Sequence, residues 1–161
     1  MTGRKANAAP LRRITLTIDT SDASAKALAF VLTKFQPDRS TEEGGRAPFH
    51  VTVLHVIKRR PLAPIEVRFT APWLKSEKKV RDAGRRLVDQ TVQQLLEAGF
   101  TAEPICKIGD PAEEITKLAA KLHTDMIVMG AKGLSAIDRI LLGSVSMRVV
   151  QYATCPVLVV G

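Results

Sequence analysis

The sequence predicts an α/β fold in which a parallel sheet is covered by helices on both faces. Short β-branched runs alternate with segments of helical periodicity from residue 12 onward. The runs at 50–57 and 125–130 are too apolar for strands with one face in water, which is typical of a buried parallel sheet. Strands and helices that alternate in this way connect through right-handed crossovers. We therefore expect one doubly wound domain over residues 12–161, after a disordered basic tail at 1–11.

The first half of the domain begins with a strand at 12–19, RRITLTID. Residues 20–22 then offer capping oxygens to a helix, and its predicted buried face is Ala25, Leu28, Ala29, Leu32 and Phe35. After a long polar connection, 50–57 forms the second strand. Three prolines are expected to block regular structure before the next helix: Pro61, Pro64 and Pro72. That helix runs from about Trp73 to Ala98, where Gly99 offers a left-handed stop and Phe100 the apolar contact that often follows it.

The second half repeats the pattern. Residues 101–108 form a strand whose Pro104 suits a sheet edge better than its centre. Asp110 to Glu113 resembles a capping box before a helix, with the buried face Ile115, Leu118, Ala119 and Leu122. A central strand at 125–130, a helix at 144–153 and a last strand at 156–160 complete the domain.

Composition limits the function classes. The chain has 161 residues, 45% hydrophobic and 25% charged, which is the balance of a soluble globular protein. It has no apolar run of the roughly 20 residues that a membrane helix needs, and its start lacks the apolar stretch of a secretory signal. We expect a cytoplasmic protein with no membrane partner. The two cysteines show no metal-ligand spacing and are expected to be small core side chains.

Basic residues concentrate in one segment. The net charge is +8, and residues 58–86 contain ten basic against three acidic side chains. Such a segment attracts nucleic acid, an acidic membrane surface or polyphosphate. Its aromatic residues, Phe69 and Trp73, are too few for a base-stacking platform. A solvated loop and helix face is the favoured interpretation, and a binding module for nucleic acid or an acidic partner is the alternative.

Ligands of such sheets bind beyond the carboxyl ends of strands where the strand order reverses, which selects Asp19 and the loop after Gly130. Gly130 and Gly133 would allow positive φ and a close backbone approach to an anion. Residues 143–146, GSVS, open a helix whose free N–H groups and two hydroxyls could bind phosphate, and Asp19 could accept from ribose. The spacing matches neither common phosphate fingerprint. A turn and a helix boundary without a ligand therefore remain an alternative.

The stretch MGAKGLSAIDRILLGSVSMRVVQYATCPVLVV at 129–160 resembles the signature of the universal stress protein family, in its ATP-binding branch. The resemblance extends to Thr17-Ile18-Asp19, to Leu54-His55-Val56 and to the Gly-Asp-Pro at 109–111. It implies strand order 3-2-1-4-5, Thr17 and Asp19 beside the nucleoside, and an adenine contact from the Val56 backbone. Met129 and Gly130 would pack by the ribose and phosphates, with a charge contact at Lys132. The triphosphate, with the Mg²⁺ that it usually brings, would be held by Gly133, Gly143, Ser144, Val145 and Ser146.

These observations predict an ATP-binding stress-response or regulatory protein whose nucleotide occupancy tunes conformation or assembly. No residue is placed as a general base for water attack, so we expect no enzyme activity. A slow ATP-hydrolysing or adenylate-transferring enzyme is the alternative. The last strand, PVLVV at 156–160, has no charged residue to protect an exposed edge. We expect a homodimer in which two copies pair through this strand, as the resemblance also implies.

Overall fold

The structure, a computed structural model, describes residues 12–35, 49–59, 64–132 and 142–161. The predicted tail at 1–11, most of the polar connection after the first helix, and Gly133 lie outside the described residues. The elements are, in chain order, β1 Arg13–Thr17, α1 Asp22–Lys34, β2 His50–Lys58, α2 Ile65–Arg68, α3 Ala71–Glu97, β3 Thr101–Gly109, α4 Pro111–Lys121, β4 Met126–Gly130, α5 Ser144–Tyr152 and β5 Val157–Val160.

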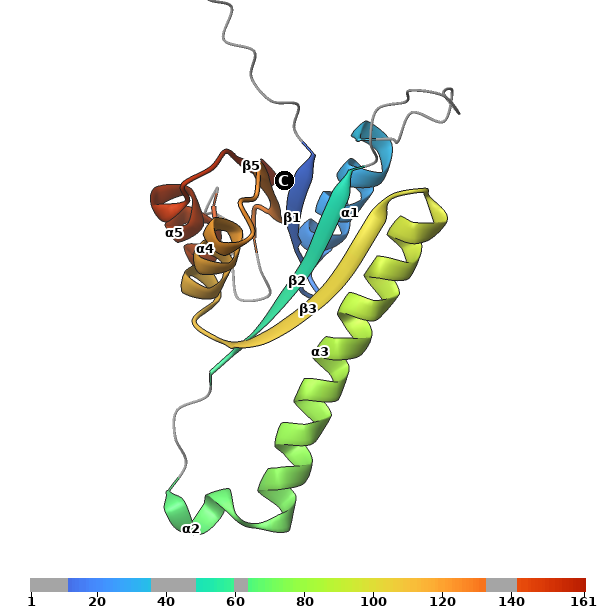
Figure 1. Ribbon diagram of the computed structural model, residues 1–161. Coiled ribbons are helices and arrows are strands. Elements are labelled where there is room, and N and C mark those ends of the chain that lie inside the picture. The colour runs from blue at the N-terminus through green and yellow to red at the C-terminus, as the bar shows by residue number, and fades with distance from the viewer. Residues whose placement is uncertain (1–11, 36–48, 60–63, 133–141) are drawn as a thin grey trace, which may run out of the picture.

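The strands form one parallel sheet in the order β3-β2-β1-β4-β5, which confirms the predicted topology (Figure 1). After β1 the chain builds β2 and β3 on one side, and it later returns to add β4 and β5 on the other. The order therefore reverses between β1 and β4. In folds of this kind, ligands bind at the carboxyl ends of the strands at such a reversal point.

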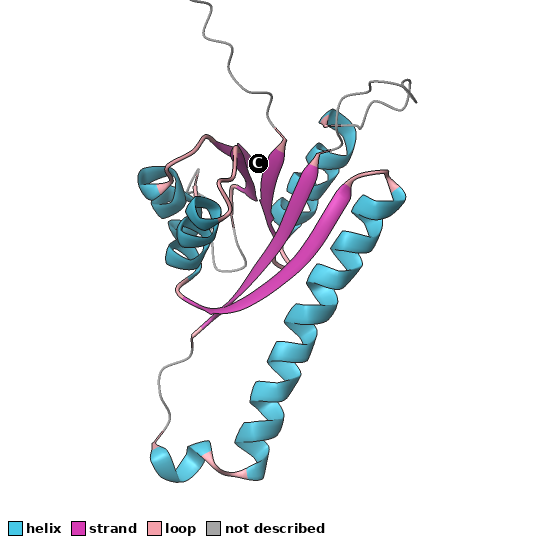
Figure 2. Cartoon of the chain, viewed as in Figure 1, coloured by secondary structure: helices cyan, strands magenta, loops and turns pink. Residues whose placement is uncertain are grey.

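Helices cover both faces of the sheet (Figure 2), and a hydrophobic core lies on each face. On one face α1 and α3 cover alternate residues of β1 and β2, and the buried side chains include Leu16, Val53, Val31 and Leu95. On the other face α4 and α5 cover residues such as Leu54 and Ile127, together with Ile115, Leu118 and Val149 from the helices. Because β2 and β4 each contribute to both cores, their near-continuous apolar sequences are explained. No helix in the described part of the chain is long and apolar enough to cross a bilayer.

Both sheet edges lie where the sequence predicts them. Pro104 is exposed in β3, where it pairs with Val53 of β2, the one neighbour of this strand. At the other edge β5 pairs with β4 alone, and all four of its residues are only half-buried.

Helix ends follow the predicted capping chemistry with one exception. At the end of α3, Gly99 has φ 91°, and the Phe100 N–H donates to the Leu95 carbonyl at 3.0 Å. At the start of α4, the Asp110 carboxylate accepts from the Glu113 N–H at 3.0 Å. The Glu113 side chain was expected to reach back to the cap, but it pairs with Lys117 one turn later. The capping box is thus only half formed.

The prediction of the buried face of α1 is wrong, because the helix is rotated about its axis relative to the expectation. The buried residues are Ser24, Ala27 and Val31, whereas Ala25 and Ala29 are exposed. The reason is tertiary, because α1 approaches β4 so closely at Ala23 that this contact fixes the rotation of the helix. Leu28, Leu32 and Phe35 still pack against the core, at its margin.

The segment after β2 differs most from expectation. Pro72 does not block a helix but lies in the first turn of α3, where the missing N–H has no intrahelical acceptor to lose. The short helix α2 was not predicted. Together α2 and the first half of α3 project well beyond the sheet (Figure 1). We call residues 64–86 the arm; Gly84, where α3 reaches β2 and β3, is the one buried residue in it.

Candidate functional site

The residues predicted to bind a ligand converge on the carboxyl edge of the sheet at the reversal of strand order. Thr17 ends β1, with Asp19 just beyond it, and Gly130 ends β4 next to β1. Ser144 begins α5, which returns to this edge. Elements far apart in sequence therefore meet at one place.

Ala131, just after β4, joins β4, β5 and α5 through hydrogen bonds; we call this the Ala131 junction. Its N–H donates to the carbonyl of Val160 at the end of β5, at 2.7 Å. Its own carbonyl accepts from the Gly143 N–H at 2.7 Å and from the Ser146 hydroxyl at 2.7 Å. The start of α5 is thereby held against the end of β4.

The N-terminus of α5 is built to present backbone donors. Its N-cap is Gly143, which has no side chain that could cap the helix. The first intrahelical bond runs from the Met147 N–H to the Gly143 carbonyl at 2.9 Å. The N–H groups of Ser144, Val145 and Ser146 therefore have no acceptor within the helix. With the positive end of the helix dipole, three such donors form an anion-binding arrangement.

Ser146 contributes differently from its prediction. Its hydroxyl was expected to donate to a phosphate, but the side chain is 2% exposed and donates to the carbonyls of Ala131 and Gly143. This hydroxyl is structural, and only the Ser146 N–H is left for a ligand. The Ser144 side chain is exposed, as a phosphate-binding hydroxyl requires.

Asp19 is oriented by the start of α1. Its Oδ1 accepts from the Ser21 N–H at 2.9 Å and also from the Ser21 hydroxyl, while the Asp19 N–H donates to Ser24 Oγ at 2.9 Å. The Ser21 hydroxyl also lies 3.3 Å from the carbonyl of Lys132, which links α1 to the segment after β4. Oδ2 of Asp19 has no hydrogen bond within the described residues. The carboxylate is thus fixed, with one oxygen available to accept.

Gly130 is needed for a reason other than the predicted one. Among the described glycines only Gly99 has positive φ, so Gly130 does not use that freedom. Instead, a Cβ at this position would lie 2.7 Å from the Ala23 carbonyl carbon and 2.9 Å from the Ala23 Cβ. The absent side chain lets α1 dock on β4, and through α1 it places Asp19 and Ser21.

The remaining predicted residues divide between the edge and the core. The Leu54 carbonyl accepts from the Ile18 N–H at 2.9 Å, so it points toward β1. Two residues further on, the backbone of Val56 points the same way, past the last residue of β1. Thr17 and Lys132 are half-buried at the edge, but the Met129 side chain is 4% exposed and belongs to the core under α4 and α5.

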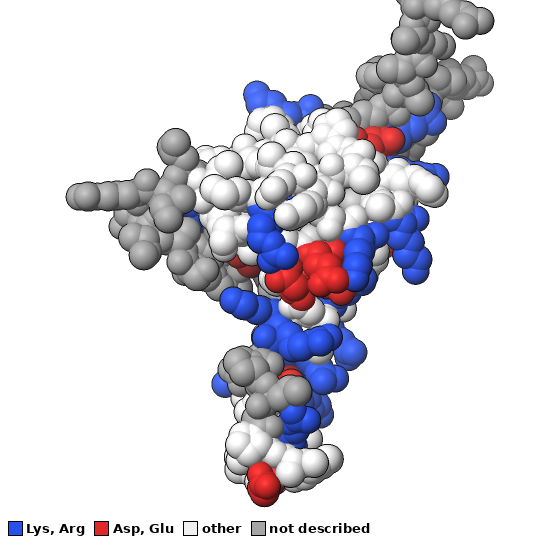
Figure 3. Space-filling view, turned by 90° about the vertical axis from the view of Figure 1, so that its left-hand side faces the viewer, with Lys and Arg blue, Asp and Glu red and all other residues white. Residues whose placement is uncertain are grey.

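One ion pair beside the site was not predicted. Arg148, in the middle of α5, donates to the Asp110 carboxylate at 2.8 Å and so links α5 to the start of α4. The hydrogen bond from Arg148, together with that from the Glu113 N–H, holds the pKa of Asp110 below its usual value. Figure 3 shows acidic side chains on this face with basic side chains beside them. Within the described ranges, no cluster of three or more His, Cys, Asp or Glu could hold a metal ion.

The two cysteines lie outside this junction. Cys106 packs against the core beneath α1 and α3, and Cys155 against the core beneath α4 and α5. Both are free thiols, and burial raises the pKa of each. Both were expected to be buried, and the structure places them partly buried at the margins of the cores.

Comparison with known proteins gives the family. The sequence profile described as the universal stress protein family matches residues 10–161. The chain belongs to this family. Universal stress protein YxiE of Bacillus subtilis is 29% identical over 153 residues, which cover 92% of this chain and 97% of YxiE.

Solved structures agree with the assignment. Protein MJ0577, from Methanocaldococcus jannaschii, superposes with a TM-score of 0.74 at 28% identity, over 93% of this universal stress protein and 95% of MJ0577. A family member from Arabidopsis thaliana with AMP bound superposes with a TM-score of 0.61 at 22% identity, over 92% and 90% of the two chains. The latter likeness establishes the common fold.

Proposed function

We propose that this universal stress protein binds an adenine nucleotide at the carboxyl edge between β1 and β4, and that ATP is the leading candidate. The observation that supports this most is the start of α5, where a glycine cap leaves three backbone N–H groups without an acceptor in the helix, at the carboxyl edge of the sheet. An anionic group of several oxygens matches these donors. The AMP-bound relative has the same fold, which supports an adenine nucleotide as the ligand.

The nucleoside half of the ligand would lie toward β1 and β2. Oδ2 of Asp19 is available to accept from ribose hydroxyls, as acidic residues at strand ends do in dinucleotide sites. The Val56 backbone would read the adenine edge, and Thr17 would border the base. On the phosphate side, Lys132 and Gly133 would join the donors of α5, and Mg²⁺ would arrive with the triphosphate.

Nucleotide binding is proposed as a regulatory event in the cytoplasm and not as a step of catalysis. The site residues offer donors for phosphate and an acceptor for ribose. Among the described site residues we assign none as a general base for water attack, and the buried Ser146 hydroxyl already donates to two carbonyls. Occupancy would instead alter conformation or assembly through the Ala131 junction.

The direct test is calorimetric titration of the purified protein with ATP and Mg²⁺, after mass spectrometry of any nucleotide released on denaturation. Binding should also raise the melting temperature, since a ligand at a hundredfold excess over its Kd adds about 2.7 kcal/mol. Absence of both heat and thermal shift at saturating ATP would disprove the proposal.

Ser144→Asp separates ligand binding from folding. A carboxylate in the first turn of α5 interacts favourably with the helix dipole, by about 0.3–1 kcal/mol, so the protein without ligand should not lose stability. The same charge opposes phosphate, so ATP affinity should fall at least tenfold. Gln151→Glu makes the same change of charge at the exposed far end of α5 and serves as the control. Equal loss of affinity in both variants would place the phosphates elsewhere.

We further propose a homodimer through the outer edge of β5. The carbonyls of Pro156 and Val160 accept from β4, so the N–H groups of Val157 and Val159 point away from the sheet by strand alternation. Beside this edge, α5 exposes Met147 and Val150 at 54% and 49%. An open edge next to apolar side chains suits pairing with a second copy.

Val159→Pro tests this interface. Proline removes an outward N–H but leaves the bonds to β4, so the fold should persist while pairing is lost. We expect light scattering to give a dimer for the wild type and a monomer for the variant, with similar circular dichroism. A wild-type chain that stays monomeric at high concentration would contradict the proposal.

A further inference from the structure

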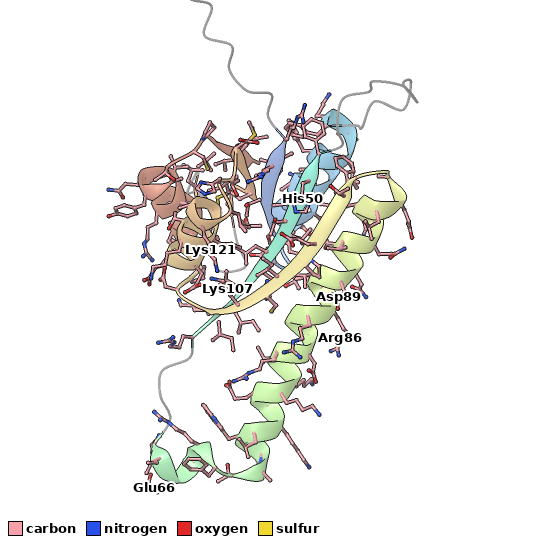
Figure 4. All side chains as sticks on the ribbon, viewed as in Figure 1. His50, Glu66, Arg86, Asp89, Lys107 and Lys121 are labelled. Carbon is pink, nitrogen blue, oxygen red and sulfur yellow. The ribbon has the colours of Figure 1, made fainter. Side chains whose placement is uncertain are left out.

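The tip of the arm exposes large apolar side chains. Phe69 is 77% exposed, Ile65 64%, Leu74 53% and Val67 41%. Ile65 and Val67 lie in α2, Phe69 follows it directly, and Leu74 lies in the first turn of α3. All four are at the end of the arm farthest from the sheet (Figure 4, where Glu66 marks this end). Clustered apolar exposure of this kind marks a surface that meets another molecule.

Basic side chains form a collar behind this tip. They are Lys75, Lys78, Lys79, Arg81, Arg85 and Arg86, and all six are exposed. None of the six forms an ion pair with any residue that the structure describes. Figure 3 shows Lys and Arg gathered over this part of the arm, between the body and a mostly uncharged end. Lys75 to Arg81 lie within roughly 15 Å of the start of α3, at about 1.5 Å per residue.

We propose that the arm docks on the surface of an anionic phospholipid bilayer, with the apolar tip in the headgroup region and the collar over the acidic headgroups. The order along the arm matches the depth profile of a membrane surface, apolar first and cationic behind. This peripheral contact departs from the expectation of no membrane partner, which interpreted the basic segment as a solvated loop and helix face and did not include the exposure of the apolar tip.

Two other classes of binding partner match the arm less well. A second copy of the arm would bring two like-charged collars together, since residues 64–86 hold seven basic and three acidic side chains. A nucleic acid would use the collar but has no role for four exposed aliphatic and aromatic side chains at the tip. A lipid surface uses both features.

Trp73 provides a local readout, because it is the one tryptophan of the chain and lies in the first turn of α3. The full-length protein would be mixed with vesicles of phosphatidylcholine alone and with equimolar phosphatidylcholine and phosphatidylglycerol. We expect co-sedimentation and a blue shift of tryptophan emission with the anionic vesicles only, and both should weaken as salt is raised. Failure of the wild type to bind these vesicles would overturn the proposal.

Two variants test the two halves of the surface. Lys78→Glu with Lys79→Glu should reduce vesicle affinity at least tenfold, and Phe69→Ser should reduce it without any change of charge. The control, Lys26→Glu with Lys121→Glu, makes the same change of charge at exposed positions of α1 and α4 (Lys121 in Figure 4). An equal effect of the control pair would reduce the interaction to net charge and refute a role for the arm.

Nucleic acid is tested in parallel by fluorescence polarisation with a labelled duplex. Tighter binding to the duplex than to anionic vesicles, unchanged in Phe69→Ser, would assign the collar to nucleic acid and overturn the proposal. Because none of the substituted side chains is buried, melting temperatures should stay close to that of the wild type. The lipid and salt dependence of the wild type tests the proposal even where a variant fails to fold.

Discussion

Replacement of Gly130 by alanine should destabilise the fold before it affects any ligand. The added Cβ would meet the carbonyl carbon of Ala23 at 2.7 Å and its oxygen at 2.9 Å. These are backbone atoms in the first turn of α1, so they cannot move without displacing the helix. Overpacking of this kind costs about 1–3 kcal/mol. We expect a loss of about 2–3 kcal/mol, or a melting temperature lower by roughly 5–10 °C for a chain of this length.

Two other glycines supply matched controls for the same substitution. A Cβ at Gly109 would also come within 2.7 Å of another atom, but that atom is Cγ of the flexible Glu114 side chain. A Cβ at Gly161 would meet nothing closer than 3.9 Å. Gly109→Ala and Gly161→Ala should therefore change the free energy of unfolding by less than about 1 kcal/mol. Urea denaturation of the three variants measures the series, and the reasoning fails if Gly130→Ala is as mild as Gly109→Ala.

Two further predictions concern buried and charged hydrogen bonds. The Thr15 and Thr124 hydroxyls form a buried hydrogen bond of 2.7 Å with each other. Either Thr→Val substitution alone should lower the free energy of unfolding by about 1–3 kcal/mol, because it leaves the partner hydroxyl without a hydrogen bond. A double-mutant cycle in urea should show that the double variant loses less than the sum of the two single variants. Oδ2 of Asp125 accepts from the N–H groups of Arg12 and Arg13, both at 2.8 Å, and these bonds lower the pKa of Asp125. Its stabilisation is therefore present above the unfolded pKa of about 3.9 and is lost as pH falls through the lower folded value. Asp125→Asn should reduce the loss of unfolding free energy at acid pH by about 1 kcal/mol or less, because the group is part-exposed. Urea denaturation over a range of pH measures this, and a variant with the same pH dependence as the wild type would contradict the prediction.

Local patterns were sufficient for the strands and the longer helices, and the family resemblance supplied the strand order. Apolar runs located β2 and β4 because these strands are buried on both faces, and Pro104 identified an edge because proline cannot donate to a second neighbour. Gly99 and Asp110 marked helix ends because capping depends on residues close in sequence. Each of these features is decided within a few residues.

Features that depend on distant contacts were missed or misread. The rotation of α1 follows from the approach of Ala23 to Gly130, which helical periodicity cannot reveal. The Ser146 hydroxyl looked available for a ligand, but it donates a hydrogen bond to the carbonyl of Ala131, fifteen residues away. The prolines near the arm suggested irregular chain, although Pro72 suits a first helical turn. For the candidate site, the sequence located the edge and the donors of α5, whereas the role of Gly130 and the Arg148–Asp110 pair required the structure.

Ala131 would link the two proposed binding events of this protein. This residue hydrogen-bonds to the start of α5 and to the last residue of β5, so a ligand that tightened the helix start would also act on the strand where two copies would pair. Coupling between two equilibria is reciprocal: the factor by which ATP strengthens association equals the factor by which association strengthens ATP binding. With such coupling, dilution of the protein would by itself release nucleotide. The cellular concentration of this universal stress protein would then act as a signal in its own right, alongside the concentration of ATP.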